Sequence, residues 1–196
     1  QKVQEAAQKR KVTPTEHVNE YVLRFKSIWE KLNIEYDDFI RTTEKRHTDR
    51  VKDILVFLKD KGDIYLDEYE GLYSVSEERF ITEKEAEEHN FKEIKVLKEK
   101  NYFFKMSKYQ DELINHINSH PNFIKPQTRK NEILGFLRND LSDLCISRPK
   151  SRLSWGIELP FDNNYVSYVW FDALLNYITA IGWNSDNRKF NNYWPA

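Results

Sequence analysis

The sequence predicts an α/β fold in which a segment of different character interrupts the chain. The first third carries apolar residues at helical spacing, and the last quarter returns to a strand followed by a helix. Between them, from about Ile64 to Lys98, apolar residues come in short alternating runs that favour strands. An insertion within an α/β domain explains this order of patterns.

Two helices are expected in the first third. Thr13 can cap the first helix, Pro14 suits its first position, and Glu16 completes a capping box. The apolar residues that follow share helical spacing and form one wide face: Val18, Tyr21, Val22, Phe25, Ile28, Trp29 and Leu32. A second helix is expected from about Asp49 to Gly62, and both helices are expected to pack into a core.

The middle of the chain predicts a small set of strands that a charged stretch interrupts. This stretch, 83–93, is expected to hold a short helix capped by Thr82 and Glu85. The segment therefore combines strands with helices, unlike the helical first third.

The remaining elements follow from caps and periodicity. Ser107 is expected to cap a helix that ends at Pro121, and another helix runs from about Thr128. In the last quarter, 166–170 is typical of a strand and 172–182 of a helix.

The composition is that of a folded protein without a strong net charge. Aromatic residues make up 14% of the 196 residues, too much ring area for a disordered chain. Basic and acidic residues number 31 and 32, so a nucleic-acid or membrane partner would need a local patch. No apolar run reaches the ~18 residues of a membrane span.

The cysteine content indicates the cellular compartment, and the first residues indicate that the chain is part of a longer protein. The single cysteine excludes a disulfide framework and favours an intracellular, cytoplasmic protein. The opening residues do not form a signal peptide, and the only methionine is Met106. We therefore expect the chain to begin inside a longer protein.

Histidine, cysteine and glycine patterns define no catalytic site. His116 and His120 can share a helical face, but no third ligand stands at a zinc-protease spacing, so structural or solvent-exposed histidines are preferred. Cys145 lies in an apolar run, where a cysteine is usually a small buried hydrophobe. The five glycines are all isolated, so no glycine-rich phosphate loop is predicted.

Two clusters remain as candidate sites. Residues 147–152 hold three cations and two hydroxyls beside a proline, which suits a phosphate group, although a solvated basic turn is the commoner explanation. The second cluster can line a pocket for a polarisable apolar ligand, although such a stripe is more often plain core. It consists of Trp170, Ala173, Leu174 and Tyr177.

A series of segments, in order, resembles the methionyl-tRNA synthetases, a family of class I aminoacyl-tRNA synthetases. The segments are 38–43, 61–65, 69–73, 101–104, 129–132, 146–148 and 168–177. Together they extend the match over nearly all of the chain. So many separate motifs in one order make a chance match improbable.

The two signatures with which this family adenylates methionine are absent in working form. These are the HIGH motif and the KMSKS loop. Residues 105–108 resemble the second, but Tyr109 stands where its last serine belongs, and the neighbouring residues match the family's insertion. The resemblance therefore implies the central part of a synthetase, which we expect to be inactive alone.

The resemblance also implies a division of the chain. An interrupted Rossmann-type catalytic domain would comprise 1–65 and 147–196, with an α+β connective-peptide insertion at 66–146. That insertion often carries a zinc knuckle in the family. Ser74 and Ser76 stand near the positions of its cysteines, and serine hydroxyls do not replace thiolates, so no zinc is expected.

Roles for the two clusters follow from the same resemblance. The family residues that line the methionine side-chain pocket correspond to Trp170, Ala173, Leu174 and Tyr177. Aromatic contacts with a thioether sulfur are favourable, so the assignment is chemically sound. Arg148 matches a family arginine near the ATP phosphates and is the expected catalytic residue. Lys150 and Arg152 are expected to face ATP, the tRNA end or water.

The implied activity is that of a methionine–tRNA ligase. Such an enzyme uses L-methionine, ATP with Mg²⁺ and tRNA(Met), and it needs no membrane. A non-catalytic binding or structural fragment is one alternative. Another class I synthetase is a second alternative, against which the methionine-type pocket argues.

Overall fold

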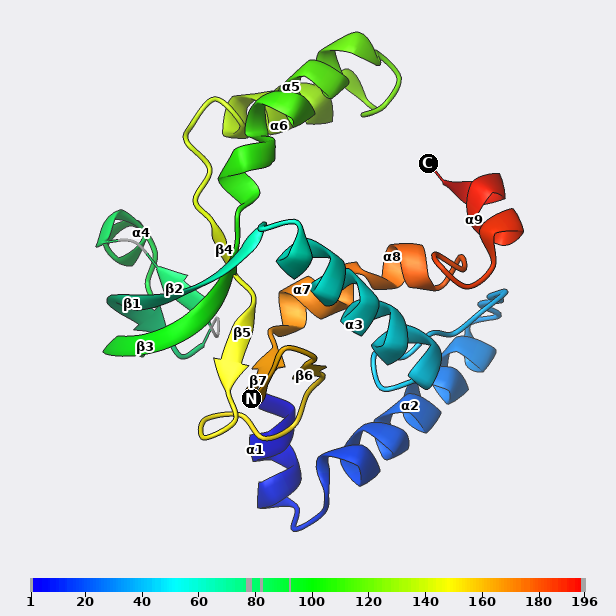
Figure 1. Ribbon diagram of the computed structural model, residues 1–196. Coiled ribbons are helices and arrows are strands. Elements are labelled where there is room, and N and C mark those ends of the chain that lie inside the picture. The colour runs from blue at the N-terminus through cyan, green and yellow to red at the C-terminus, as the bar shows by residue number, and fades with distance from the viewer. Residues whose placement is uncertain (1, 77–78, 82, 92, 195–196) are drawn as a thin grey trace.

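The computed structural model describes residues 2–76, 79–81, 83–91 and 93–194 (Figure 1). The first half contains α1 (Lys2–Lys9), α2 (Pro14–Lys31), α3 (Lys45–Asp60), β1 (Ile64–Ser74), β2 (Arg79–Ile81), α4 (Glu83–Glu88) and β3 (Ile94–Phe104). The 3-10 helix η1 (Met106–Tyr109) leads to α5 (Gln110–Ser119), α6 (Gln127–Phe136), β4 (Leu144–Cys145) and β5 (Ser147–Pro149). The last elements are β6 (Glu158–Leu159), β7 (Asp162–Ser167), α7 (Val169–Leu174), α8 (Asn176–Thr179) and α9 (Asn187–Tyr193).

The strands form two sheets, ordered β2-β1-β3-β4 and β5-β7-β6. All pairings between these described strands are antiparallel. The backbone of Ile146 joins the sheets, because its N–H donates to the Tyr102 carbonyl and its carbonyl accepts from the Tyr168 N–H, both at 2.8 Å. The expected strands of the middle segment are thus confirmed as a sheet with its own helices, α5 and α6, which extend away from it (Figure 1). The domain bounds 1–65, 66–146 and 147–196 remain a prediction.

The apolar core lies where α3 meets residues of both sheets and of α7. It consists of Val51, Ile54, Leu55, Ile64, Tyr102, Ile146, Ile157, Leu159 and Phe171. The prediction that α3 is a core helix is confirmed. The same prediction for α2 is wrong, because none of its residues is buried and Leu23 and Phe25 are 70% and 54% exposed. Within the described chain, α2 packs mainly on α1, which covers too little of its apolar face.

Local signals predict several element ends correctly. The Thr13–Glu16 capping box is present, with the Glu16 N–H donating to Thr13 Oγ1 at 3.2 Å. Gly62 adopts a φ of 76° just after α3, a conformation that favours glycine. The expected cap at Thr82 lies outside the described residues.

Three boundaries differ from expectation. Helix α3 begins at Lys45 rather than Asp49, because its polar first turn lies outside the apolar pattern. Ser107 does not cap α5, since it lies in η1 and its hydroxyl donates to Asp143 at 2.6 Å. The strand expected at 166–170 ends at Ser167, and α7 begins at Val169. Helix α1 was not predicted from the sequence.

Candidate functional site

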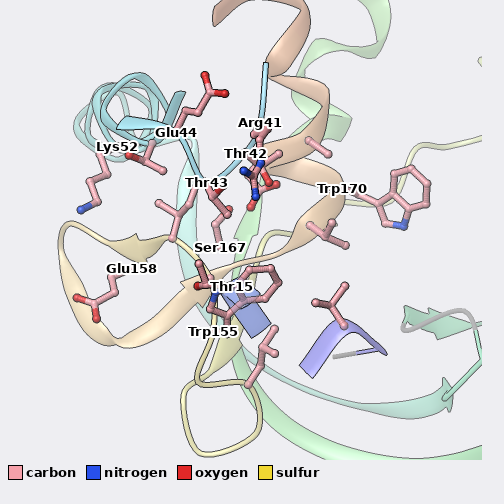
Figure 2. Close-up of a pocket in the computed structure, with 18 of the residues that line it drawn as sticks. Thr15, Arg41, Thr42, Thr43, Glu44, Lys52, Trp155, Glu158, Ser167 and Trp170 are labelled. Carbon is pink, nitrogen blue, oxygen red and sulfur yellow. The ribbon is translucent and has the colours of Figure 1, made fainter. Parts of the chain in front are cut away.

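A cavity of about 990 Å³ opens between the N-terminal helices, α3 and α7. Its walls come from the start of α1, one side of α2, segment 41–44, loop 153–158 and the first turns of α7. Figure 2 shows Trp170 at one side of this cavity and Glu158 at the other. Cations, carboxylates, hydroxyls and tryptophan rings all line it, so it suits a ligand with both charged and apolar parts.

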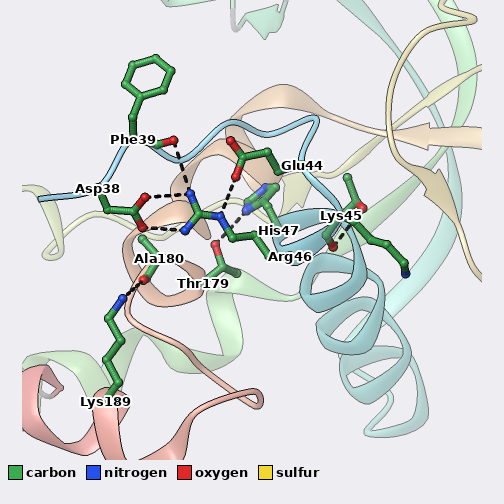
Figure 3. A network of polar contacts seen from close by, with 10 residues as sticks. Asp38, Phe39, Glu44, Lys45, Arg46, His47, Thr179, Ala180 and Lys189 are labelled. Atoms are coloured by element: carbon green, nitrogen blue, oxygen red, sulfur yellow. Dashed lines mark hydrogen bonds and ion pairs between the residues drawn. The ribbon is translucent and has the colours of Figure 1, made fainter.

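Segment 41–44 is held in the cavity wall by hydrogen bonds at both ends, and Figure 3 shows those at the Glu44 end. The Arg46 guanidinium donates to both oxygens of Asp38, at 2.6 and 2.9 Å, and to Glu44 at 2.6 Å. These bonds lower the pKa of Asp38. Arg41 donates to Asn19 Oδ1 at 2.8 Å, which joins the segment to α2. These bonds fix the position of this part of the wall.

The methionine-pocket residues inferred from the resemblance lie on α7 and α8. Trp170 and Ala173 line the cavity, whereas Leu174 and Tyr177 are not among its lining residues. Trp170 and Leu174 are each 57% exposed and Tyr177 is 73% exposed. Ala173 is half-buried, so within the described chain none of the four belongs to the apolar core. They form an open apolar surface beside the cavity.

Arg148 is buried rather than directed at the cavity. Only 4% of the residue is exposed, and it is not among the cavity-lining residues. Its guanidinium carbon lies 4.0 Å from the centre of the Tyr168 ring and 5.9 Å from that of Tyr73. It also donates to the Ser147 carbonyl at 2.7 Å and contacts Cys145 Sγ at 3.1 Å. Cys145 is half-buried and contacts a cation, so it matches the small buried hydrophobe expected there only in part; desolvation raises the pKa of its thiol.

The other two cations of the basic turn have protein partners. Lys150 Nζ lies 2.5 Å from Glu158, and this ion pair lowers the pKa of Glu158. Arg152 pairs with Glu99 of β3 at 3.2 Å and lies over the Tyr73 ring at 4.2 Å. The turn is thus tied to both sheets, and it is not simply solvated.

Residues 105–108 make structural contacts. Lys108 donates to Asp63 at 2.6 Å, and the Tyr109 hydroxyl donates to the same carboxylate. These bonds lower the pKa of Asp63 to about 2. Lys105 donates to the Gly62 carbonyl at 2.8 Å. These contacts hold η1 and the residue before it against the turn that follows α3, which agrees with the rejection of the segment as a KMSKS loop.

The histidines have structural surroundings or lie at the surface. His47 is buried, and its Nδ1 lies 2.8 Å from Thr179 Oγ1, which joins α3 to α8 (Figure 3). The rings of His116 and His120 stack with centroids 4.2 Å apart at the exposed end of α5. In the described ranges, His, Cys, Asp and Glu side chains form no group of three or more that could hold a metal.

Asp172 is a site residue to which the sequence assigned no role. It lines the cavity although only 7% of the residue is exposed. Burial raises the pKa of its carboxyl to about 7. The available signal was an acidic residue within the apolar run Val169 to Leu175. A buried carboxyl at a cavity wall is a common mark of a functional site.

Stability should depend on pH through Asp172. Its folded-state pKa lies above the ordinary value of 3.8, so the folded protein keeps a proton that the unfolded chain releases. The free energy of unfolding should therefore fall from about pH 4 to pH 7, by at most roughly 4 kcal/mol. Urea denaturation of the wild type and of Asp172→Asn over this range measures the effect. A difference between the two proteins that does not change with pH would contradict it.

The fold is that of a class I aminoacyl-tRNA synthetase, and the chain belongs to this family. The family model described as tRNA synthetases class I (M) matches residues 1–90 and 88–196. More particularly, the chain is 48% identical to the methionine–tRNA ligases of Fusobacterium nucleatum and Clostridium perfringens. These matches cover 99% and 100% of this chain but only 31% of each relative, so the chain spans about a third of their length. The resemblance seen in the sequence is confirmed.

A solved structure agrees over the whole chain. It is described as Mycobacterium tuberculosis methionyl-tRNA synthetase in complex with methionyl-adenylate, and it superposes with a TM-score of 0.88 at 38% identity. The match covers 100% of this chain and 40% of that one. The predicted class I synthetase α/β fold is therefore confirmed. No helix within the described ranges has the length and apolar character needed to cross a membrane.

Proposed function

We propose that this chain is the central part of a methionine–tRNA ligase. The complete enzyme would join methionine and ATP into methionyl-adenylate and then transfer the methionyl group to tRNA(Met) in the cytoplasm, without a membrane. The observation that carries this proposal is the similarity, over the whole chain, to a synthetase structure bound to methionyl-adenylate. Its curated relatives are also named methionine–tRNA ligases.

The open apolar surface on α7 and α8 is the proposed methionine side-chain site. Its residues are Trp170, Ala173, Leu174 and Tyr177. Aromatic rings attract a thioether sulfur, and the exposed area leaves room for a ligand. Shape alone separates similar apolar side chains by only about 1–3 kcal/mol per methylene. Contact between aromatic rings and the thioether sulfur would therefore add to the selection of methionine.

The polar part of the cavity is proposed to take ATP with its Mg²⁺. Arg41 and Lys52 supply positive charge there, and threonine hydroxyls supply hydrogen bonds. Catalysis would then consist mainly of positioning the carboxylate and the α-phosphate and offsetting charge. Lys150 and Arg152 would contact phosphate or the tRNA end only after giving up their ion pairs with Glu158 and Glu99. The burial of Arg148 favours an indirect role.

Exchange of pyrophosphate into ATP, measured on the longer protein with each amino acid in turn, tests this function. Methionine should support exchange and the other amino acids should not. Preference for a different amino acid would show another class I synthetase. Absence of exchange with all of them would favour a non-catalytic module.

We expect no stoichiometric zinc in the purified protein. The hydroxyls of Ser74 and Ser76 lie 3.1 Å apart, where the resemblance places the knuckle cysteines. Neutral hydroxyls are poor zinc ligands compared with thiolates. Elemental analysis after dialysis measures the metal, and one tightly bound equivalent per chain would contradict the prediction. Ser74→Cys with Ser76→Cys is the matched variant in which zinc affinity should increase.

A further inference from the structure

We propose that Glu99 is a positioning residue that fixes one wall of the cavity from outside it, by holding Arg152. The wall belongs to the cavity loop, which we define as residues 150–157 between β5 and β6. Glu99 lies in β3 of the other sheet and is not among the cavity-lining residues. The effect of Glu99 on ATP rests on the proposed function, whereas its hold on the loop rests on the contacts alone.

The first step is the surface of the four-stranded sheet that receives the loop. Tyr73 is opposite Lys95 in the pairing of β1 with β3, so Glu99 and Asn101 lie on the same face of the sheet as Tyr73. Asn101 is fully buried, and its Nδ2 donates to Glu99 Oε2 at 2.7 Å. The carboxylate of Glu99 is thus oriented from within its own strand.

The second step is the support that Asn101 receives from the second sheet. Ser147 of β5 is also fully buried, and its Oγ donates to Asn101 Oδ1 at 3.1 Å. The same Oγ accepts from the Tyr102 N–H at 2.8 Å. Leaving a buried polar group unpaired is costly, so these bonds keep the amide of Asn101 in one orientation. Its Nδ2 therefore stays directed at Glu99.

The third step is the binding of Arg152 to this surface. Arg152 Nη1 donates to Glu99 Oε2 at 3.2 Å, and the guanidinium carbon lies 4.2 Å from the centre of the Tyr73 ring. The side chains of Arg152 and Glu99 are only 21% and 16% exposed, so solvent screens the pair weakly. A planar guanidinium can pair with a carboxylate and lie over a ring at the same time. Both partners of Arg152 belong to the four-stranded sheet.

The fourth step leads from Arg152 to the cavity. The N–H groups of Arg152 and Leu153 both donate to the Pro149 carbonyl, at 3.0 Å, so the two residues share one turn. Leu153 lines the cavity, and so does Trp155, which Figure 2 shows apart from Trp170. Displacement of Arg152 would therefore move this part of the wall.

The end of the cavity loop borders the part of the cavity proposed for ATP. Glu158 directly follows the loop and lines the cavity, as does Lys52 of α3. Lys150 and, to a smaller extent, Lys52 lower the pKa of Glu158, so both cations lie near this carboxylate. A loop that is no longer held by Glu99 should therefore affect the use of ATP more than the use of methionine.

Limited trypsin digestion of the longer protein tests the hold on the loop. Trypsin can cut after Lys150 and after Arg152, and mass spectrometry identifies both cuts. Cleavage of a folded protein reports local opening, so Glu99→Gln should speed these cuts about tenfold. Glu68→Gln is the matched control, because Glu68 lies in the same sheet but pairs with an exposed lysine, Lys98, at 3.3 Å. The control should leave cleavage of the loop unchanged.

Steady-state pyrophosphate exchange by the same proteins tests the effect on the cavity. Glu99→Gln should raise KM for ATP about fivefold, while kcat and KM for methionine stay within about twofold. A general loss of folded protein would lower kcat and would not produce this split. Arg152→Gln removes the other partner and should reproduce the rise, which keeps the test decisive if Glu99→Gln does not fold. In the double variant the two effects should not add.

Three results would overturn the inference: unchanged cleavage of the loop in Glu99→Gln, unchanged KM for ATP, or additive effects in the double variant. Wild-type protein without methionine-dependent exchange would instead refute the proposed function and the effect on ATP. The digestion would still decide whether Glu99 holds the loop.

Discussion

The 196-residue chain alone should show no methionine-dependent pyrophosphate exchange above background. Its sequence contains neither the HIGH nor the KMSKS signature in working form. Residues 105–108, the only segment that resembles either one, are engaged with Asp63, Gly62 and Asp143. Groups that hold ATP and stabilise the reacting phosphorus are each worth a few kcal/mol. At about 1.36 kcal/mol per tenfold, loss of several of them lowers the rate by many orders of magnitude.

The measurement needs a preparation free of the host's own synthetase. Arg148→Ala, made in the same chain and purified in parallel, reports any contaminating activity, because contamination would be equal in both samples. Activity in the chain that is clearly lower in this variant would refute the prediction. It would also mean that residues 105–108 had been rejected incorrectly as a signature.

Trp170→Ala in the longer protein should weaken the use of methionine far more than the use of ATP. The indole is 57% exposed beside the cavity, so it is available to cover the methionine side chain. Burying a large apolar side chain is worth about 1.5–3 kcal/mol, which corresponds to a loss of roughly 10- to 100-fold in kcat/KM for methionine. Exchange kinetics with each substrate varied in turn measures the two effects.

Trp194→Ala is the matched control for this substitution. Trp194 is also partly exposed, at 42%, but it lies just beyond α9 and does not line the cavity. Its removal should leave both kinetic constants close to those of the wild type. Equal losses for methionine and ATP in Trp170→Ala would show that the indole supports the fold and does not bind the amino acid.

Much of the fold could be predicted because it depends on near neighbours in the chain. The Thr13–Glu16 capping box and the turn at Gly62 each involve a few consecutive residues, and both are present. The alternating runs after Ile64 likewise predicted the paired strands β1 and β3. Periodicity could not reveal that α2 is unburied, because burial depends on what packs against a face.

The candidate site was predicted only in part, for the same reason. The α7 residues could be named from their spacing and from the family resemblance, and Trp170 and Ala173 do line the cavity. The cavity itself is formed by segments as distant as Lys2 and Asp172. No local pattern brings such segments together.

By itself the sequence determined the family, the local elements and the residue types at the proposed pocket, because these are recorded in short motifs. Only the tertiary structure decided which partners the charged groups have, how deeply they are buried and how their pKa values shift. Arg152 meets Glu99 from 53 positions away, and Arg148 lies close to the rings of Tyr73 and Tyr168, which are far apart in the sequence. Asp172 keeps a raised pKa because distant segments exclude water from it. Charges respond to the dielectric and to partners in space, and both are products of folding.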